Sequence, residues 1–461
     1  MYKFSKEQVL DPVFLTKLIR RFKSEQIPVF IKEQKYYEVK TEILSRTMTD
    51  GKPNNQLAHG FCRYITNMAT SYFAGKPIRY SFTAKNKDDE QEMEKYKEAL
   101  LTVFKQNYID SLNFEVSKEA SKKGIGFYLM FSNESSELRI KKMDAEMIIP
   151  IYSSSLDEFL EAAVHIWSDY DIDGLLIAEY ADVYDNMQIY HYRRLSGEMV
   201  FSEYKNPEYH KMGDIPVIIV WNNEEQMGDY ETIITLNNAY DNAQSDTAND
   251  MDYFTDAYLC ITGASSMVEA ALTDEEAEND ETAAKNLRKN RILFLDEHGQ
   301  AEWLTKTVND AANENYKTRL YKDIFFLSQV PALTDESFSG NLSGIAIKYK
   351  MTGLEELAIM KENKMRSAQT KMLKIATSFL NTKMNKQWDP DVIEQKYDRN
   401  FVDNISDIIT DVRNIDGIVS KETQLDMLPQ NIVSDTTKEI NRIRQEALDA
   451  ENLSKIDIGT L

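Results

Sequence analysis

The sequence predicts an α+β fold in which helices dominate, and three observations support this prediction. Only 16 of the 461 residues are glycine and 10 are proline, too few for the many tight turns of an all-β chain. Hydrophobic residues make up 42% of the chain, which is enough to build buried cores and argues against wholesale disorder. The apolar residues follow a helical period over long stretches and change to short strand-like segments only between residues 124 and 221.

Helices are predicted at four places in the N-terminal part of the chain. Ser5 and Gln8 have the spacing of a capping box, and Asp11-Pro12 supplies an N-cap followed by proline at the first helical position. Farther along, apolar residues that recur every three or four positions form a single stripe before a glycine and proline stop signal. The predicted helices span residues 5–10, 12–25, 55–73 and 88–106.

Between residues 124 and 221 the sequence is typical of an antiparallel meander. Its segments are short, rich in Tyr, Val, Ile and Phe, and separated by Asp, Gly, Asn and Ser. We interpret the tyrosines as half-buried sheet positions, although a platform on which nucleic-acid bases stack has the same composition. The predicted strands span residues 126–131, 163–170, 177–184, 188–193, 198–204 and 216–221.

A long helix is predicted over 229–259, about 45 Å in length. Its apolar residues lie on one narrow seam with a step near 3.5 residues, which indicates side-by-side packing with neighbouring helices. The remaining surface of this helix carries aspartate and glutamate but no lysine or arginine, so we expect that surface to face water. The seam residues that we assign to contacts between subunits are Ile233, Leu236, Tyr240, Met251 and Phe254.

A compact insert follows Gly263 and separates this helix from a second one. Six of the eight residues in 274–281 are acidic, and a strand is predicted at 291–295. We expect the acidic stretch to be exposed, because six carboxylates cannot be desolvated together without partners. Whether it is a docking surface or merely a solvated loop stays open. The second helix spans about 307–328 and ends before Pro331.

Residues 334–342 are rich in Ser, Gly, Asn and Asp and are predicted to form a loop. Ser343 then caps a very long helix over 344–381. We expect a kink at Gly353, because a glycine in the middle of a helix costs about 1 kcal/mol relative to alanine. From Trp388 onward the sequence predicts a strand and further helices.

The sequence contains no motif of common catalytic chemistry, so we expect no enzyme activity, no cofactor and no metal site. It has no GxxxxGK[ST] phosphate loop, no HExxH or CxxC metal spacing and no GxSxG elbow. Asp171-Ile172-Asp173-Gly174 resembles the start of a calcium loop but lacks the remaining ligands, so we interpret it as a turn. A magnesium-dependent nuclease would use clustered acids, but no such constellation is recognisable.

The net charge of −22 argues against a protein that grips DNA, because lysine and arginine are needed to displace counterions from phosphates. Cys62 and Cys260 lie in apolar, helix-like patterns and are interpreted as free buried thiols of a reducing compartment. No signal-like segment opens the chain, and it contains no apolar run of about eighteen residues. We therefore expect a soluble protein of a cytosol-like compartment with no membrane association.

The order of these elements resembles the portal, or head–tail connector, proteins of tailed double-stranded-DNA bacteriophages, of the siphophage type. The shared motifs are structural rather than chemical, and it is their order from residue 53 to residue 445 that makes the resemblance specific. The first stretch is an early helix from Pro53-Asn54-Asn55 that ends in Gly75-Lys76-Pro77-Ile78, and the second is Ile215-Pro216-Val217 with Asn222-Asn223, ahead of the helix that holds Tyr240-Asp241-Asn242. The third is Ser343-Gly344-Ile345-Ala346 at the start of the long helix. The fourth is Gly417-Ile418-Val419 with Leu428-Pro429 and Lys438-Glu439-Ile440.

The resemblance implies a ring of about twelve copies around a central channel at the capsid vertex, through which DNA is packaged and ejected. It also implies a virion protein that is assembled in the cytoplasm of the host. The implied regions are a wing at 1–228, a first stem helix at 229–259, a clip at 260–306, a second stem helix at 307–331, a tunnel loop at 332–343, a long kinked helix with a return to the wing at 344–399, and a helical crown at 400–461.

The implied partners are other copies of the chain, the DNA duplex in the channel, the terminase motor, the head–tail adaptor, and capsid and scaffolding proteins. The tunnel loop is expected to line the narrowest part of the channel. Alternatively, it is an ordinary surface loop whose Phe338 packs on its own subunit. The residues expected to face DNA are Asp335, Glu336, Ser337, Phe338, Ser339, Gly340, Asn341, Leu342, Lys348 and Lys350.

The acidic composition agrees with a conduit, because a negative wall repels the duplex and keeps it centred while it moves. An acidic helical scaffold or adaptor that binds only proteins would explain the charge and the missing motifs equally well. It would not explain the order of helix, insert, helix, loop and long helix.

Overall fold

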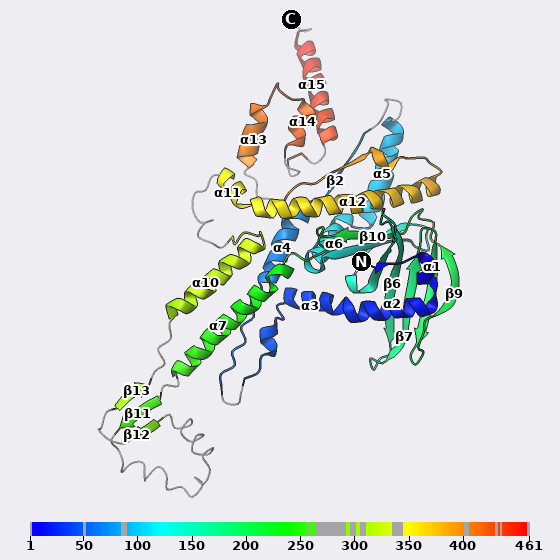
Figure 1. Cartoon of the computed structure of the whole chain (residues 1–461). Helices are drawn as coiled ribbons and strands as arrows, with labels where there is room; N and C mark the ends of the chain where they lie inside the picture. Colours follow the sequence, from blue (N-terminus) through cyan, green and yellow to red (C-terminus); the bar gives the residue numbers. More distant parts are fainter. Residues whose placement is uncertain are drawn as a thin grey trace. The chain divides into compact units, whose positions relative to one another are not determined.

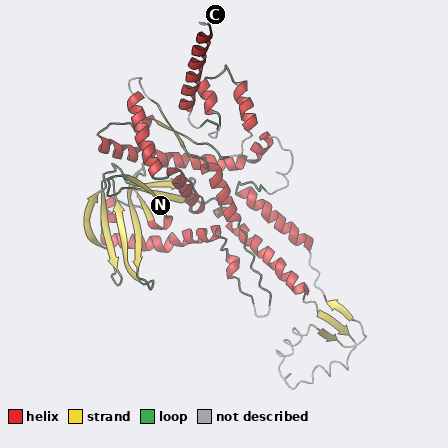
Figure 2. Ribbon diagram, turned by 180° about the vertical axis from the view of Figure 1, so that it is seen from behind, coloured by secondary structure: helices red, strands yellow, loops and turns green. Residues whose placement is uncertain are grey.

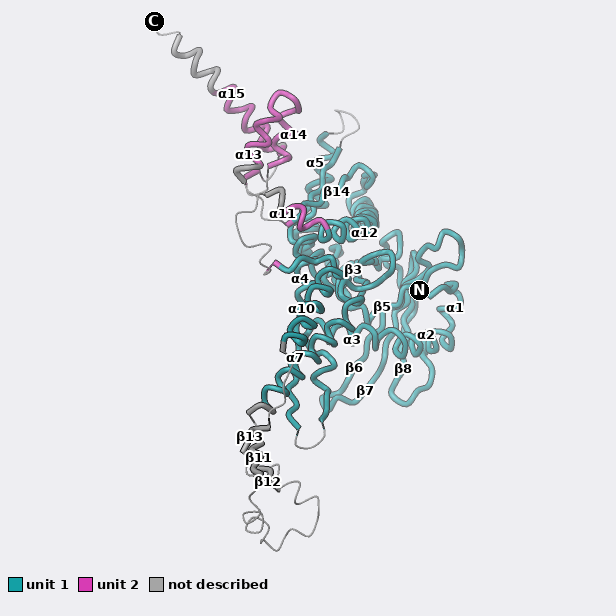
Figure 3. The backbone as a smooth tube through the Cα atoms, turned by 60° about the vertical axis from the view of Figure 1, so that its left-hand side comes forward, with its two compact units in different colours: residues 1–332, 353–399 teal, residues 333–352, 400–461 magenta. Residues whose placement is uncertain are grey.

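The computed structural model describes residues 2–48, 52–83, 90–255, 258–262, 292–295, 301–304, 310–333, 344–400, 405–428, 432–433 and 436–458. It divides into two compact units, shown in teal and magenta in Figure 3. The first unit comprises Met1–Ala332 and Gly353–Arg399, and the second comprises Leu333–Thr352 and Asn400–Leu461. Helices and strands are both present and helices dominate, which confirms the predicted α+β, mainly α class.

Three helices open the first unit, and their capping signals are confirmed. They are α1 (Lys6–Leu10), α2 (Pro12–Glu25) and α3 (Ile27–Tyr37). The backbone N–H of Gln8 donates to the Ser5 hydroxyl, and the Gln8 side chain accepts from the Ser5 N–H, as a capping box requires. The Asp11 carboxylate accepts the N–H of Phe14 at 2.9 Å, with Pro12 at the first helical position.

A six-stranded sheet follows the order β1-β5-β6-β7-β8-β9, and its last five strands form an antiparallel meander (Figure 2). The strands predicted at 163–170, 177–184 and 188–193 belong to it, whereas those predicted at 126–131 and 216–221 are β3 (Ile125–Ser132) and β10 (Val217–Trp221) of a separate sheet. Asp171 accepts the N–H groups of Asp173 and Leu175 in the β6–β7 turn, where Gly174 has a φ of 81°; the interpretation as a turn is therefore confirmed. The strands are β1 (Tyr2–Lys3), β5 (Ile148–Tyr152), β6 (Leu160–Tyr170), β7 (Leu176–Tyr184), β8 (Gln188–Leu195) and β9 (Ser202–Tyr209).

The strand predicted at 198–204 is displaced toward the C-terminus. Glu198 belongs to the turn between β8 and β9, where its N–H bonds the carbonyl of Leu195 and its carboxylate accepts the Leu195 N–H. Gly197 allows this turn with a φ of 93°. The hydrogen bonds of this turn occupy the residues before the strand, so β9 begins only at Ser202.

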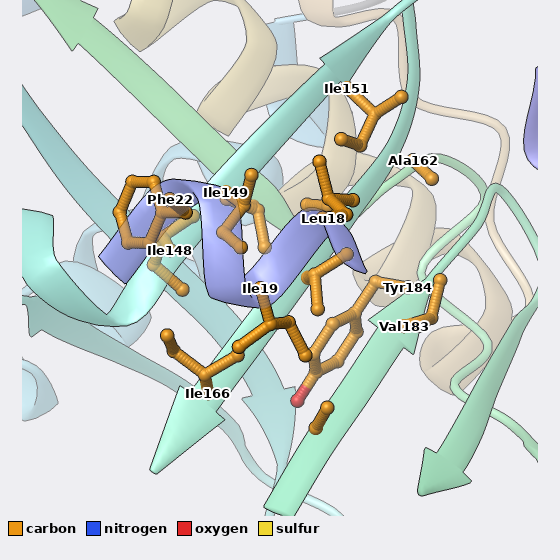
Figure 4. Close-up of a cluster of buried hydrophobic side chains, with 14 of the residues drawn as sticks. Leu18, Ile19, Phe22, Ile148, Ile149, Ile151, Ala162, Ile166, Val183 and Tyr184 are labelled. Atoms are coloured by element: carbon orange, nitrogen blue, oxygen red, sulfur yellow. The ribbon is translucent and has the colours of Figure 1, made fainter. Parts of the chain in front are cut away.

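Helix α2 covers one face of this sheet and closes the first hydrophobic core. Leu18, Ile19 and Phe22 of α2 point onto Ile148 and Ile149 of β5 (Figure 4), and all five side chains are buried. On the helix, this burial follows from apolar residues that recur every three or four positions and therefore share one face.

A second core lies between a three-stranded sheet, ordered β10-β3-β4, and the helices around it. Tyr128 of β3 is fully buried in this core, and its hydroxyl donates to Asn113 at 2.8 Å. A two-stranded pair, β14-β2, joins it. The elements are β10 (Val217–Trp221), β3 (Ile125–Ser132), β4 (Leu138–Met143), β2 (Arg79–Phe82), β14 (Ile393–Lys396), α4 (Phe61–Ala74), α5 (Glu90–Gln106), α6 (Ile109–Lys123) and α12 (Thr352–Met384).

The predicted long helix is two helices, α11 (Gly344–Lys350) and α12. The break falls at Met351, two residues before the glycine that we expected to cause the kink. Gly353 has another reason to be small: a Cβ atom there would lie 2.9 Å from the carbonyl oxygen of Gln329. It therefore permits close packing of α12 against the chain that follows α10.

The helix predicted at 229–259 is shorter, with the 3₁₀ turn η4 (Glu231–Ile233) before α7 (Ile234–Thr255). A three-stranded sheet follows, ordered β12-β11-β13, and Cys260 lies in its strand β11 rather than in a helix. The acidic stretch 274–281 lies outside the described residues. The other elements are β11 (Tyr258–Thr262), β12 (Ile292–Leu295), β13 (Ala301–Leu304), α10 (Asp310–Leu327), α13 (Ile405–Asn414), α14 (Lys421–Asp426), α15 (Thr436–Ile458), η1 (Glu42–Ser45), η3 (Ala145–Met147) and η6 (Pro390–Val392).

Candidate assembly and channel site

Helices α7 and α10 lie side by side as an antiparallel pair (Figures 1 and 2). Lys317 of α10 donates to Gln244 of α7 at 3.3 Å, which fixes the level of one helix against the other. Leu320 and Ile324 are buried on the inner side of α10. These two helices correspond to the sequence regions expected to form a stem.

An extended segment, residues 52–60, runs along a second side of α7 in place of the predicted start of a helix. The backbone N–H groups of Asn55, Leu57 and His59 donate to side chains of α7 at 2.7, 2.9 and 2.9 Å. The acceptors are Asn249, Ser245 and Asp241, which stand four residues apart on the helix. Because these side chains satisfy the backbone donors, the segment stays extended and α4 begins only at Phe61.

Asp241 is the centre of this contact and is fully buried. Its carboxylate accepts the N–H of His59 at 2.9 Å, the Thr41 hydroxyl at 2.6 Å and the Asn237 amide at 3.0 Å. The Nδ1 atom of His59 lies 2.8 Å from the same carboxylate. These hydrogen bonds connect η1, residues 52–60 and α7 through one buried side chain.

Aromatic rings fill the space between α4, α7 and α10. The ring of Phe61 meets those of Tyr240, Tyr321 and Phe325 at centroid distances of 5.0, 6.0 and 5.9 Å. Edge-to-face packing of this kind adds to the free energy gained from apolar burial. Tyr240 therefore packs within its own subunit.

The residues of the predicted seam do not share one environment. Ile233 is fully buried in η4, Leu236 is half-buried, and Tyr240 is half-buried against Phe61. Met251 is 63% exposed, and the side chain of Phe254 lies outside the described residues. The assignment of this seam to contacts between subunits stays a prediction.

The acids of the stem region do not all face water, which corrects the expected acid-only outer surface. Asp229 and Asp241 are buried, and Asp246 pairs with Arg46 at 2.7 Å while its side chain remains 62% exposed. Sequence reasoning missed these roles because a polar residue on a helix usually indicates a solvated face. The signal that could have revealed them is the row Asn237, Asp241, Ser245 and Asn249 at four-residue steps.

A buried ion pair joins α12 to the start of the stem. The Lys361 ammonium lies 2.8 Å from both carboxylate oxygens of Asp229, and the two side chains are 6% and 1% exposed. The Asn222 amide donates to the same carboxylate at 2.8 Å, and the Ser121 hydroxyl donates to it as well. This network connects α6, β10 and α12 at the point where the chain turns into η4.

A second buried carboxyl, Glu33 of α3, lies beside η4 without a hydrogen-bond partner for its Oε2 atom among the described residues. Burial, and then the nearby Glu231 carboxylate, raise the pKa of Glu33 to about 8; Glu146 acts in the same direction, and Lys123 and Lys32 oppose it. Glu33 is therefore protonated in the folded state at neutral pH.

We expect the stability of the first unit to fall as the pH rises from about 4.5 toward 8, at no more than about 1.4 kcal/mol per pH unit from Glu33. In this window the folded state binds the proton that the unfolded chain has released, so raising the pH favours unfolding. Urea titrations between pH 5 and 8 measure the slope. Glu33→Gln, which mimics the neutral acid, should flatten it, and an unchanged slope in this variant would contradict the assignment.

The residues predicted to face DNA are only partly described. Asp335, Glu336, Ser337, Phe338, Ser339, Gly340, Asn341 and Leu342 lie outside the described residues. Lys348 and Lys350 lie on α11 in the second unit, where Lys348 is exposed and Lys350 is half-buried.

The described residues contain no group of three or more His, Cys, Asp or Glu side chains placed to hold a metal ion. Among the helices described, none combines the length and apolarity needed to cross a bilayer. A cavity beside Asn113 and Met365 has a volume of about 10 Å³, enough for one water molecule and too small for a ligand.

Comparison with known proteins decides the family. A family model described as phage portal protein, SPP1 Gp6-like, matches residues 17–452. The chain belongs to this family of phage portal proteins. It is 25% identical to the portal protein of Bacillus phage SPP1 over 463 residues, covering 95% of this chain and 86% of the relative. It is also 22% identical to the portal protein of Clostridium phage phiCD119 over 401 residues, covering 81% and 83% of the two chains.

Membership of the portal family confirms the resemblance seen in the sequence and the portal function that it implied. Phage portal proteins are virion components that take part in capsid formation and DNA packaging, and their family is a structural one rather than an enzyme family. The match includes η4, α7, α10, α11 and α12, so the region around α7 lies within the shared fold.

Proposed function

We propose that this chain forms a ring of about twelve copies whose central channel carries double-stranded DNA into and out of the capsid. Family membership over residues 17–452 is the observation that carries this proposal. The stem would be the α7–α10 pair, the wing would hold both hydrophobic cores, and the clip, tunnel loop and crown would follow the boundaries given by the sequence. The ring would dock a terminase motor during packaging and a head–tail adaptor afterwards, within a shell of capsid and scaffolding proteins assembled in the host cytoplasm.

The charge distribution favours a channel through which DNA moves over a protein that binds DNA tightly. Helix α7 has four aspartates and no lysine or arginine between Ile234 and Thr255, and Asp246 among them is largely exposed. Repeated around a ring, such a surface repels phosphates and limits contacts that would slow the duplex. The buried Asp229 and Asp241 contribute to rigidity instead, because their charges are matched by donors inside the subunit.

Electron microscopy of the purified full chain in negative stain tests the proposal directly. We expect rings with a central hole, and light scattering should give the mass of a closed oligomer of this 53.4 kDa chain. Monomers or small oligomers at every concentration would instead favour an acidic adaptor that binds only other proteins. Metal-dependent cleavage of DNA by the purified chain would favour a nuclease.

The tunnel-loop assignment leads to a separate prediction. Deleting residues 337–341 should leave rings of normal size, because the loop has no expected part in the α7–α10 contact, but should reduce the DNA packaged or retained in capsids. The DNA content of purified particles measures this effect. Replacing the same five residues with a Gly/Ser stretch is the matched control for loop length. Packaging and retention at the normal level in the deletion variant would mean that the loop does not contact DNA.

A further inference from the structure

Helices α3, α4 and α6 pack against one another and bring three cationic side chains around the ring of Tyr37 (Figure 1). The ammonium groups of Lys118 and Lys122 lie 5.0 and 5.3 Å from the ring centroid, and the guanidinium carbon of Arg63 lies 5.7 Å from it. Tyr37 is the last residue of α3, Arg63 belongs to the first turn of α4, and the two lysines stand one turn apart on α6. We call these four residues the Tyr37 cluster.

Two of these cations have no carboxylate partner in the described part of the chain. Lys122 pairs with Glu119 at 2.9 Å, and the same carboxylate also binds Lys123 at 2.6 Å. Neither Arg63 nor Lys118 lies within ion-pairing distance of an acidic side chain among the described residues. Two positive charges therefore stand beside one ring without a counterion.

The acceptors at the end of α3 are bound to other groups. The Glu38 carboxylate, next to Tyr37 in the chain, accepts from the Gln34 amide at 2.8 Å and from Lys40 at 2.6 Å. The carbonyl groups of Gln34, Lys35 and Tyr36 accept backbone N–H groups that follow the helix. Attraction to free carbonyls at a helix C-terminus therefore does not account for the cluster.

The local potential around Tyr37 is positive, although the chain as a whole carries a net charge of −22. Burial raises the pKa of Tyr37, but Lys118 and Arg63 lower it further, so the pKa lies below its usual value. The face of one aromatic ring attracts a cation only weakly and does not offset three of them. A bound anion would relieve the repulsion between these cations.

We propose that the Tyr37 cluster binds a small phosphate anion between Arg63 and Lys118. The guanidinium group offers two parallel donors to phosphate oxygens, and the ammonium group supplies a second positive charge from another helix. Arg63 is exposed, whereas Tyr37 and Lys122 are only 9% and 8% exposed, so the anion reaches the cluster from the side of Arg63. This site goes beyond the proposed channel and does not depend on the ring.

A small phosphate fits the cluster better than the backbone of a DNA duplex. A duplex carries one negative charge per roughly 1.7 Å of its axis, so its binding needs many exposed cations. Of the two unpaired cations in the cluster, Arg63 is exposed and Lys118 is half-buried. A single phosphate group carries a charge of about −1.5 to −2 at pH 7, which two cations match.

Equilibrium dialysis of the full chain against radiolabelled inorganic phosphate tests the site, with chloride added to hold the ionic strength constant. We expect saturable binding of one phosphate per chain. Lys118→Met and Arg63→Gln should each raise the dissociation constant by about tenfold or more, because each removes a charged contact to the anion. Arg63→Lys keeps the charge but loses the paired donors, so its effect should be smaller.

Lys32→Met is the matched control on a neighbouring ring. Lys32 also belongs to α3 and lies 5.8 Å from the centroid of an adjacent aromatic ring, that of Tyr36, but it is exposed and outside the cluster. This variant changes the net charge as much as Lys118→Met does, so it should leave the dissociation constant for phosphate unchanged. Circular dichroism checks that each variant is folded.

Absence of saturable binding, or an equal loss of affinity in Lys32→Met and Lys118→Met, would overturn the site. Displacement of the phosphate by a short DNA duplex at the same concentration of phosphate groups would assign the cluster to the DNA backbone and overturn the small anion. Fewer rings in Lys118→Met and Arg63→Gln, without phosphate binding by the unmodified chain, would instead assign the two cations to an acid of another copy.

The test also keeps this inference apart from the proposed function. Phosphate binding that is lost in Lys118→Met and Arg63→Gln while rings form normally would support the site alone. A chain that binds phosphate at this cluster but forms no rings would overturn the proposed function and leave the site intact.

Discussion

Replacing Lys361 with Met should lower the free energy of unfolding of the first unit by about 3–5 kcal/mol. The substitution keeps the length of the side chain but leaves the Asp229 carboxylate, 1% exposed, without its cation. An unpaired charge in a buried site costs far more than the loss of an exposed ion pair. Urea unfolding followed by tryptophan fluorescence measures the change.

Two controls define the origin of this effect. Lys361→Met combined with Asp229→Asn removes both charges and should recover much of the loss, because no buried charge then remains uncompensated. Lys205→Ala removes an exposed partner of Glu208 and should leave the unfolding midpoint unchanged. A single Lys361→Met variant as stable as Lys205→Ala would show that the ion pair does not hold α12 to the start of the stem.

Asp241→Asn should destabilise the contact between residues 52–60 and α7 by about 3 kcal/mol, although the two side chains have nearly the same size. The carboxylate accepts from His59, Thr41 and Asn237, whereas an amide offers one oxygen and turns a donor toward the same groups. At least one buried donor therefore loses its acceptor. Hydrogen–deuterium exchange at the amides of Leu57 and His59 should become faster by about a hundredfold.

Asp246→Asn is the matched control on the same helix. Asp246 is also an aspartate of α7, but its side chain is 62% exposed and its pair with Arg46 lies at the surface. Surface pairs of this kind contribute little, so exchange at residues 52–60 should change by less than about tenfold. Equal effects of the two substitutions would mean that lost helix charge, rather than lost hydrogen bonds, controls the contact.

Much of the fold could be predicted because local signals agree with the global structure. The Ser5 and Asp11 caps, the β6–β7–β8 hairpins and the helical periods of α5 and α10 depend on residues close in sequence. The largest error occurred where a distant partner replaced a local bond. Residues 55–60 have a helical apolar period, yet they stay extended because three side chains of α7 accept their backbone N–H groups.

The sequence by itself determined the α+β class, the acidic character, the absence of common catalytic motifs and, through the order of its elements, the portal family. These properties depend on composition and on spacing along the chain, which are present before folding. Tertiary structure decided which acids of the stem are exposed and which are buried acceptors, because Asp241 and Asp246 are both aspartates of α7 and different parts of the chain pack on them. It also decided which sides of α7 are covered within the subunit, since residues 52–60 and α10 are far apart in the chain but both pack on this helix.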